Sequence, residues 1–380
     1  MIQFVKPLVP NRLRMAYNND VVRFYSTLGG TPAYSDVTIY PGVTVRLYPD
    51  PNGRFYFNFR PYISTFINTA NFEDTTETNL TAEDPDSFVY SAMNNVATQR
   101  NVTFAINMGD AGTDTASYTL TWLAAAQQIG SYTEYNINNL LVLSPAMPDA
   151  ANTWYLKYWE GYPFDFSVFS NVTGMEVTNT TNLVSASLNV VGYGDRVFLS
   201  DGRTDETLED FLPLAKGYNT LKLLRENDSP EDAKFIQLEK AAPCEGVYLK
   251  WRNAQGGYSY WLFENTYAVD RNAKSLGELN RDFENPENSF GNTTQVGREV
   301  QDTLKIVAEL LTPPQRDIVQ NLLESPKVYL FTGKPYSRSD YRSWIEVSVK
   351  TTSARIKNPR ESLTNFAFDI ELPVRYTVSL

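Results

Sequence analysis

The stretch GVYLKWRNAQGGYSYWLF, residues 246–263, places two aromatic-rich segments on either side of a short polar turn. Aromatic and β-branched side chains favour the extended backbone of a strand. The turn at residues 253–257 ends in two glycines, and a glycine-containing connection of this length is typical of a β-hairpin. The stretch therefore predicts an antiparallel hairpin, in a chain that we expect to be mainly β.

One short α-helix is predicted downstream of this hairpin, at residues 312–325. Thr312 suits the N-cap, the two prolines that follow suit the first turn, and Gln315 occupies the capping-box position. Residues 304–311 fit a strand and a helix equally well. The chain then returns to strand patterns at 328–331, 344–349, 367–370 and 374–378. Residues 233–380 are accordingly predicted as a C-terminal β-barrel-like domain that carries one short helix.

The chain upstream of the hairpin consists of short strand patterns separated by turn residues. The segment VTVRLYPDPNGRFYFNF, residues 43–59, predicts a second hairpin around the turn at 49–53. Turn signals at such short intervals indicate a β-sandwich or jelly-roll-like region over residues 1–232, with one or two subdomains. Two polar stretches, 71–88 and 270–297, are expected to be exposed loops.

Composition excludes several chemistries. The 380 residues include no histidine and one cysteine, so the chain lacks an imidazole base and cannot form an intrachain disulfide. With 33 Lys and Arg against 44 Asp and Glu, the net charge is −11, which argues against specific nucleic-acid binding. No segment approaches the roughly 18 apolar residues of a membrane helix, so no membrane insertion is expected. We predict no catalytic residues, no cofactor and no metal.

The segment WYLKYWEGYPF, residues 154–164, allows three interpretations. Glu160 and Asp165 could be the paired carboxylates of a glycoside hydrolase. A second interpretation is a sugar-binding platform, since aromatic rings stack on sugars. The third is two core strands joined by a turn. The candidate platform residues are Trp154, Trp159, Glu160 and Tyr162.

The 246–263 hairpin resembles a pattern common in tail and baseplate structural proteins of bacteriophages that infect Bacteroidetes-type bacteria. The segments ELLTP at 309–313 and LESPKVYL at 323–330 are similar to the same proteins, and WEGYPF at 159–164 resembles them more weakly. The resemblance covers residues 236–380. It implies a distal-tail-like hub or adaptor ring subunit that connects the tail tube to distal or fibre components, and it brings no catalytic residues.

The leading prediction is a non-enzymatic structural protein that forms a homo-oligomeric ring with other virion tail proteins as partners. It would be located in the virion tail and assembled in the host bacterial cytoplasm. The alternative is a carbohydrate-binding or adhesive β-sandwich protein at a virion or cell surface. The interface is predicted to involve the helix at 312–325, the two polar loops and the hairpin aromatics Tyr248, Trp251, Tyr258, Tyr260 and Trp261.

Overall fold

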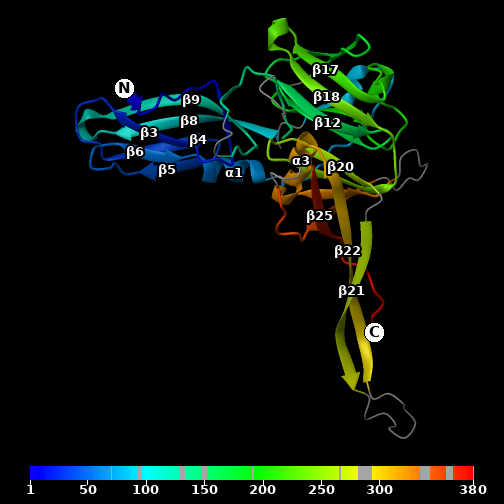
Figure 1. Cartoon of the computed structure of the whole chain (residues 1–380). Helices are drawn as coiled ribbons and strands as arrows, with labels where there is room; N and C mark the ends of the chain where they lie inside the picture. The colour runs from blue at the N-terminus through cyan, green and yellow to red at the C-terminus, as the bar shows by residue number, and fades with distance from the viewer. Residues whose placement is uncertain are drawn as a thin grey trace.

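A computed structural model describes the chain except for residues 70, 92–95, 129–132, 147–151, 191, 265–266, 281–292, 334–342, 357–362 and 380. As predicted, the described chain is mainly β, with its strands arranged in five sheets. The N-terminal sheets extend to one side of a central body, and a long hairpin extends from that body in another direction (Figure 1).

The N-terminal residues form a β-sandwich, because two sheets bury their apolar faces against each other. Phe24 of one sheet and Phe104 of the other make an edge-to-face contact with ring centroids 4.8 Å apart. The smaller sheet contains β1 (Ile2–Phe4), β3 (Val21–Ser26) and β6 (Phe55–Asn58). The larger has the order β10 (Tyr135–Asn136), β2 (Arg12–Met15), β9 (Thr113–Leu123), β8 (Ala97–Asn107), β4 (Tyr34–Tyr40) and β5 (Val43–Leu47). Helix α1 (Arg60–Asn68) adds the buried Ile63 and Ile67 to this core.

The second hairpin predicted from the sequence, at residues 43–59, is wrong. Strand β5 pairs with β4 instead, and β6 belongs to the opposite sheet, where it pairs with β3. The turn around Asp50 therefore carries the chain from one sheet to the other. The sequence could not distinguish the two cases, because alternating apolar residues face the same core from either sheet.

Two further sheets form the central body. A four-stranded sheet has the order β11 (Leu141–Val142), β13 (Phe164–Phe169), β16 (Asp195–Ser200) and β7 (Val89–Ser91). A five-stranded sheet has the order β12 (Thr153–Trp159), β18 (Lys234–Ala241), β17 (Gly217–Arg225), β14 (Met175–Asn179) and β15 (Val184–Leu188). Short 3₁₀ turns lie between strands: η1 (Pro85–Phe88), η2 (Gly109–Ala111), η3 (Leu208–Asp210) and η4 (Pro230–Asp232).

The predicted hairpin at 246–263 is confirmed. Strands β19 and β20 pair antiparallel from Gly246↔Glu264 to Arg252↔Tyr258. They begin a seven-stranded sheet with the order β20 (Tyr258–Glu264), β19 (Gly246–Arg252), β23 (Val328–Phe331), β24 (Trp344–Val349), β25 (Thr364–Glu371), β22 (Thr293–Leu311) and β21 (Tyr267–Asn280). Over the residues described, this sheet is open, with β20 and β21 at its edges, so the barrel-like closure expected here is not formed.

The predicted helix is also confirmed, as α3 (Pro313–Val319) followed by η5 (Gln320–Glu324). The Thr312 backbone N–H donates to Gln315 Oε1 at 3.0 Å, which is one half of the predicted capping box. Residues 304–311, ambiguous in the sequence, belong to β22. The strand expected at 374–378 is reduced to a single bridge between Arg375 and Val300.

The predicted division at residue 232 falls just before β18. This strand pairs with β17 and with β12, both of which precede the division. One continuous apolar core extends from these sheets to the C-terminal one, including Trp159, Leu238 and Trp251. The position of the domain boundary stays a prediction.

Of the two predicted surface loops, residues 71–84 form no helix or strand, as expected of a loop, but this segment is only partly exposed. Residues 71–88 cross the body with Leu80 and Phe88 buried in its core, so this acidic segment is tied down by its apolar side chains. Within 270–297, residues 281–292 lie outside the described part of the chain, and all the others belong to β21 and β22, which pair from Tyr267↔Ile306 to Asn280↔Thr293. Their polar composition reflects a hairpin with both faces exposed over most of its length, since neither face of β21 is buried.

Candidate functional site: a buried ion network and a projecting hairpin

The five aromatic residues predicted as an interface lie inside the folded chain. Each is at most 6% exposed: Tyr248, Trp251, Tyr258, Tyr260 and Trp261. The Trp261 ring packs edge-on against Trp159 at 5.1 Å, and the Tyr248 hydroxyl donates to the carbonyl of Pro163 at 2.8 Å. These side chains hold the hairpin against the body. The prediction that these five residues form an interface is therefore wrong, because a buried ring cannot contact a partner. They belong to the core.

The prediction of an exposed sugar platform is wrong for the same reason, since its aromatic residues are buried. Trp154, Trp159 and Tyr162 are each at most 4% exposed, so they present no ring face on the surface. Glu160 is partly exposed, and its carboxylate lies 3.6 Å from the ammonium of Lys240. Of the four predicted residues, Trp154 is among those that line a pocket of about 300 Å³.

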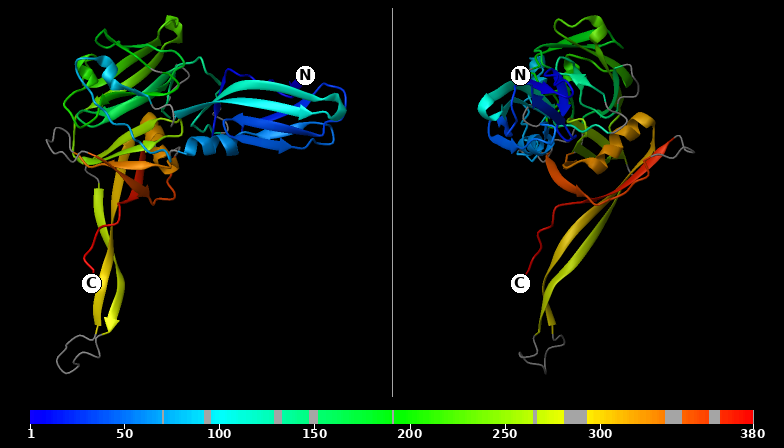
Figure 2. Two further views of the ribbon diagram at one scale, coloured as in Figure 1. Left: turned by 180° about the vertical axis from the view of Figure 1, so that it is seen from behind. Right: turned by 90° about the vertical axis from the view of Figure 1, so that its left-hand side faces the viewer.

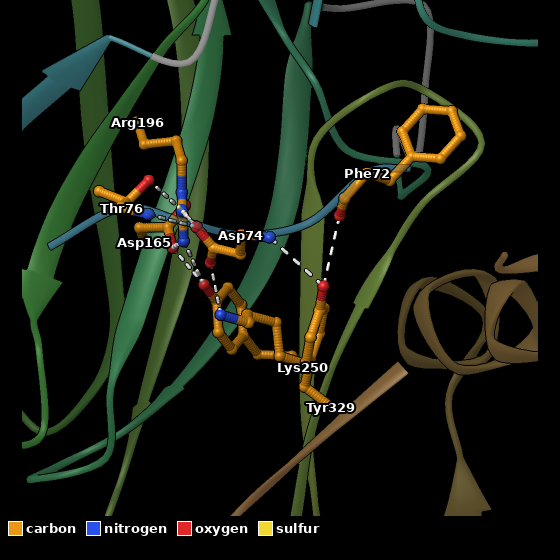
Figure 3. Close-up of polar contacts among 8 residues, drawn as sticks. Phe72, Asp74, Thr76, Asp165, Arg196, Lys250 and Tyr329 are labelled. Carbon is orange, nitrogen blue, oxygen red and sulfur yellow. Dashed lines mark hydrogen bonds and ion pairs between the residues drawn. The ribbon is translucent and has the colours of Figure 1, made fainter. Parts of the chain in front are cut away.

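Asp165, the second carboxylate of the hydrolase interpretation, belongs to a buried ion network (Figure 3). It accepts from Arg196 Nη2 at 2.6 Å and Nε at 3.1 Å, and also from the hydroxyl of Tyr260. Arg196 Nη1 reaches the carboxylate of Asp74 at 2.7 Å, and Lys250 Nζ donates to the other oxygen of Asp74 at 2.6 Å. Asp165 is thus fully engaged by these partners, which leaves it unsuited to act as an acid beside Glu160.

The network joins four segments that are separate in the sequence. Asp74 comes from the crossing segment 71–88 and Asp165 from β13, while Arg196 comes from β16 and Lys250 from β19. The network has two cations and two carboxylates, so its formal charge is 2 − 2 = 0. Buried charges are tolerated only when they are paired and hydrogen-bonded in this way. The network therefore fixes the position of the C-terminal hairpin against the body and the segment 71–88.

The pKa values in the network are shifted by burial and by pairing. Burial alone would raise the pKa of Asp74, but the charges of Arg196 and Lys250 overcome this effect and lower it. Burial lowers the pKa of Lys250 to about 8, against the opposing attraction of Asp74. The Lys250 ammonium also lies over the Trp344 ring at 4.3 Å.

The shifted pKa of Lys250 predicts a pH dependence. Between about pH 8 and the ordinary lysine pKa of 10.5, the unfolded chain holds a proton on Lys250 that the folded chain has lost. Stability therefore rises with pH over this range. Between pH 8 and 10, we therefore expect the difference in free energy of unfolding, wild type minus Lys250→Met, to increase by about 1 kcal/mol per pH unit.

Urea unfolding of both proteins at pH 8, 9 and 10 measures this difference, because titration of all other groups is shared. The exposed Lys216→Met, measured at the same three pH values, is the matched control for the loss of a lysine at the surface. A difference for Lys250→Met that stays constant or shrinks would show that Lys250 titrates normally.

The second feature is the projecting hairpin, which we call the arm: Tyr267–Asn280 and Thr293–Asp302. Figures 1 and 2 show it extending away from the body, with the C-terminal segment running beside it. Arg375 N donates to the carbonyl of Val300 at 3.1 Å, and its guanidinium pairs with Asp302 at 3.1 Å. The arm and this segment expose large apolar side chains, each at least 52% exposed: Tyr267, Val269, Leu276, Leu279, Val374, Tyr376 and Val378.

Apolar side chains of the arm gather on one face, which the ion pair between Arg271 and Asp302 interrupts. Tyr267 and Val269 lie opposite Ile306 and Leu304, and Ala273 lies opposite Val300. Because side chains alternate along a strand, these residues share a face. The other face carries polar side chains, among them Asp270, Asn272, Lys274, Glu299 and Gln301.

Sequence reasoning missed both features. A signal for the network was present: Lys250 and Arg196 interrupt otherwise apolar strands, and a charge at such a position requires a buried partner. The identity of that partner was not readable, since Asp74 lies 176 residues from Lys250. The sequence did not indicate the strands of the arm, because the apolar residues of 267–280 are spread among polar ones.

The described residues contain no group of three or more Cys, Asp or Glu side chains arranged to hold a metal ion. Burial, together with the nearby carboxylate of Glu264, raises the pKa of the Cys244 thiol to about 11. The described helices also include none of the length and apolar character needed to span a membrane.

Comparison with known proteins identifies no family. No family model matches the chain, and no curated protein matches its sequence. Among solved structures, fibronectin(III)-like modules of Clostridium thermocellum CbhA align with 7% identity over 63% of this chain and 95% of theirs, with a TM-score of 0.20. A chimeric titin Z1Z2 tandem aligns with 10% identity over 64% of this chain and all of its own, with a TM-score of 0.16. Likenesses of this size do not establish a shared fold.

Proposed function

We propose that the chain is a non-enzymatic structural subunit that assembles with copies of itself through the arm. The finer proposal is a ring in a phage tail or baseplate, connecting the tail tube to distal or fibre components. Its location would then be the virion tail, after assembly in the host bacterial cytoplasm. The observation that carries the proposal is the arm, a long exposed hairpin on which Val269 and Leu279 share one face and are each more than half exposed.

A two-stranded hairpin in water is marginally stable at best without further packing. Strand β21 also forms the edge of its sheet, and open edges of this length promote pairing with another chain. A second chain that packs on the apolar face would stabilise the hairpin, and one that pairs with β21 would satisfy its open edge.

Charge permits a second copy of the chain as that partner. The arm carries Arg271, Lys274 and Arg298 against Asp270, Glu278, Glu299 and Asp302, so its net charge is 3 − 4 = −1. Charges of both signs are therefore interspersed along the arm, and two copies can meet there with little like-charge repulsion. The resemblance of residues 236–380 to phage tail proteins supports the ring and the tail as the setting.

The oligomeric state of the purified full chain tests the proposal. We expect sedimentation velocity and negative-stain images to show closed homo-oligomers. In Val269→Lys/Leu279→Lys the apolar face gains two like charges, and we expect association to weaken by about 100-fold or more. Both residues are more than half exposed, so the fold of the monomer should be unchanged.

Asn272→Lys/Asn280→Lys is the matched control. It adds the same charge to exposed positions of the same strand, on the opposite face, and should assemble as the wild type does. A wild type that is monomeric at tens of micromolar would contradict the proposal. Equal weakening by both double variants would show that charge alone, and not the apolar face, controls association.

A further inference from the structure

The C-terminal segment Val374–Ser379 runs beside the arm and is attached to β22 (Figure 2). Arg375 forms an isolated bridge with Val300, and its guanidinium pairs with Asp302 at 3.1 Å. The hydroxyl of Thr377 donates to the carbonyl of Arg298 at 2.5 Å. Because Val300 also pairs with Ala273 of β21, the segment lies on the side of β22 that faces away from β21.

Gly297 of β22 allows the segment to approach the arm closely. A β-carbon at residue 297 would lie 2.9 Å from the Cβ of Ser379 and 3.3 Å from its Cα, so any other residue there would displace Ser379. The arm therefore positions the segment from Arg375 to Ser379.

The positioned segment exposes apolar side chains at alternate positions. Tyr376 is 106% exposed, Val378 is 97% exposed and Val374 is 52% exposed. The one charged residue of the segment, Arg375, is paired within the chain. Single exposed apolar residues are common on protein surfaces, but three on one short segment indicate an interaction surface.

The arm offers a matching surface at its other edge. Strand β21 is the last strand of its sheet, so the outer edge of residues 267–280 has no paired strand in the described chain. The same strand exposes Val269 and Leu279. An extended segment adds to an open edge of this kind through backbone hydrogen bonds, while its alternate side chains contact the strand.

The two surfaces cannot meet within one arm, because β22 lies between them. A second copy of the chain can bring them together. A contact between two different surfaces of the same chain is head-to-tail, so each added copy repeats it, and the series closes into a ring if the rotation fits. Pairing between two β21 edges would instead be a two-fold contact, which ends at a dimer.

We infer that the segment Val374–Ser379 of one copy docks along the β21 edge of the next copy. Tyr376 and Val378 are then the counterparts of Val269 and Leu279. This assignment rests on the proposed assembly through the arm, and it names the surface that β21 meets.

Sedimentation velocity of the full chain tests the role of the segment. We expect Tyr376→Lys/Val378→Lys to weaken association by about 100-fold or more, as expected for Val269→Lys/Leu279→Lys. Tyr376 and Val378 are fully exposed, so the fold of the monomer should be unchanged. The matched control is Val9→Lys/Tyr48→Lys, which replaces the same residue types at exposed positions outside the arm and should assemble as the wild type does.

A mixing experiment tests which surfaces meet. The segment variant keeps an intact β21 edge, and Val269→Lys/Leu279→Lys keeps an intact segment, so an equimolar mixture can form one complete contact. With one variant labelled by a fluorophore, we expect the mixture to form dimers that contain one copy of each. These dimers should appear at concentrations at which either variant alone is monomeric.

Three results would overturn the assignment. The segment variant could assemble as the wild type does, which would indicate pairing between two β21 edges. The mixture could stay monomeric like its components, or the control could associate as weakly as the segment variant. In each of these cases the wild type still assembles and the proposed function stands, whereas a monomeric wild type contradicts both.

Discussion

Arg196→Met is expected to lower the free energy of unfolding by about 3–5 kcal/mol. Arg196 is 2% exposed and pairs with both carboxylates of the buried network. Its removal changes the formal charge of the network from 2 − 2 = 0 to 1 − 2 = −1. Asp165 then keeps only the hydroxyl of Tyr260 among the network groups, in a site that is 1% exposed. An uncompensated buried carboxylate is among the most destabilising changes known for a single substitution.

Urea unfolding followed by tryptophan fluorescence measures this loss. The matched control is Arg46→Met, which breaks an ion pair of similar geometry with Asp36 at 2.9 Å, but on the surface. Exposed pairs contribute little, so the control should lose less than about 1 kcal/mol. If both variants lost a similar amount of unfolding free energy, the buried network would contribute no more to stability than an exposed ion pair.

Gly257→Val is expected to lower the free energy of unfolding by about 3 kcal/mol or more, through forced displacement of the hairpin turn. A β-carbon at residue 257 would lie 2.3 Å from the carbonyl oxygen of Leu143 and 3.0 Å from the Leu143 Cβ. The same carbonyl accepts from Asn253 Nδ2 at 3.0 Å, and the Gly257 N–H donates to Asn253 Oδ1 at 3.1 Å. The turn therefore cannot move away without breaking its own bonds.

Gly29→Val is the control for this prediction. Gly29 is exposed, its backbone is outside the left-handed region, and no heavy atom lies within 4 Å of a β-carbon built there. We expect a change within about 0.5 kcal/mol, as for ordinary surface substitutions. Equal unfolding midpoints for the two valine variants would show that the contact between the turn and Leu143 is dispensable.

The local structure of the C-terminal hairpin and of the helix was predictable because each depends on residues that are close in sequence. Strand-forming residues on either side of Asn253–Gly257 specify the hairpin, and Thr312 with Gln315 specifies the start of α3. The same logic failed at residues 43–59, where the local pattern fits a hairpin and a crossing between sheets equally well.

The candidate site was much less predictable. Aromatic residues of 246–263 indicated an interface, but the tertiary structure buries them against the body. Aromatic side chains stabilise cores and interfaces alike, so residue type cannot separate the two. The network depends on residues more than 100 positions apart, such as Asp74 with Lys250.

The sequence by itself determined that this protein is mainly β, that it lacks histidine chemistry, and where its C-terminal hairpin and short helix lie. These properties follow from composition and from residues within one turn or strand of each other. Only the tertiary structure decided which strands pair across sheets, which aromatic residues are buried, and that β21 and β22 project as an arm. The physical reason is that burial and ion pairing depend on distances in space, and the packing of the whole chain sets those distances.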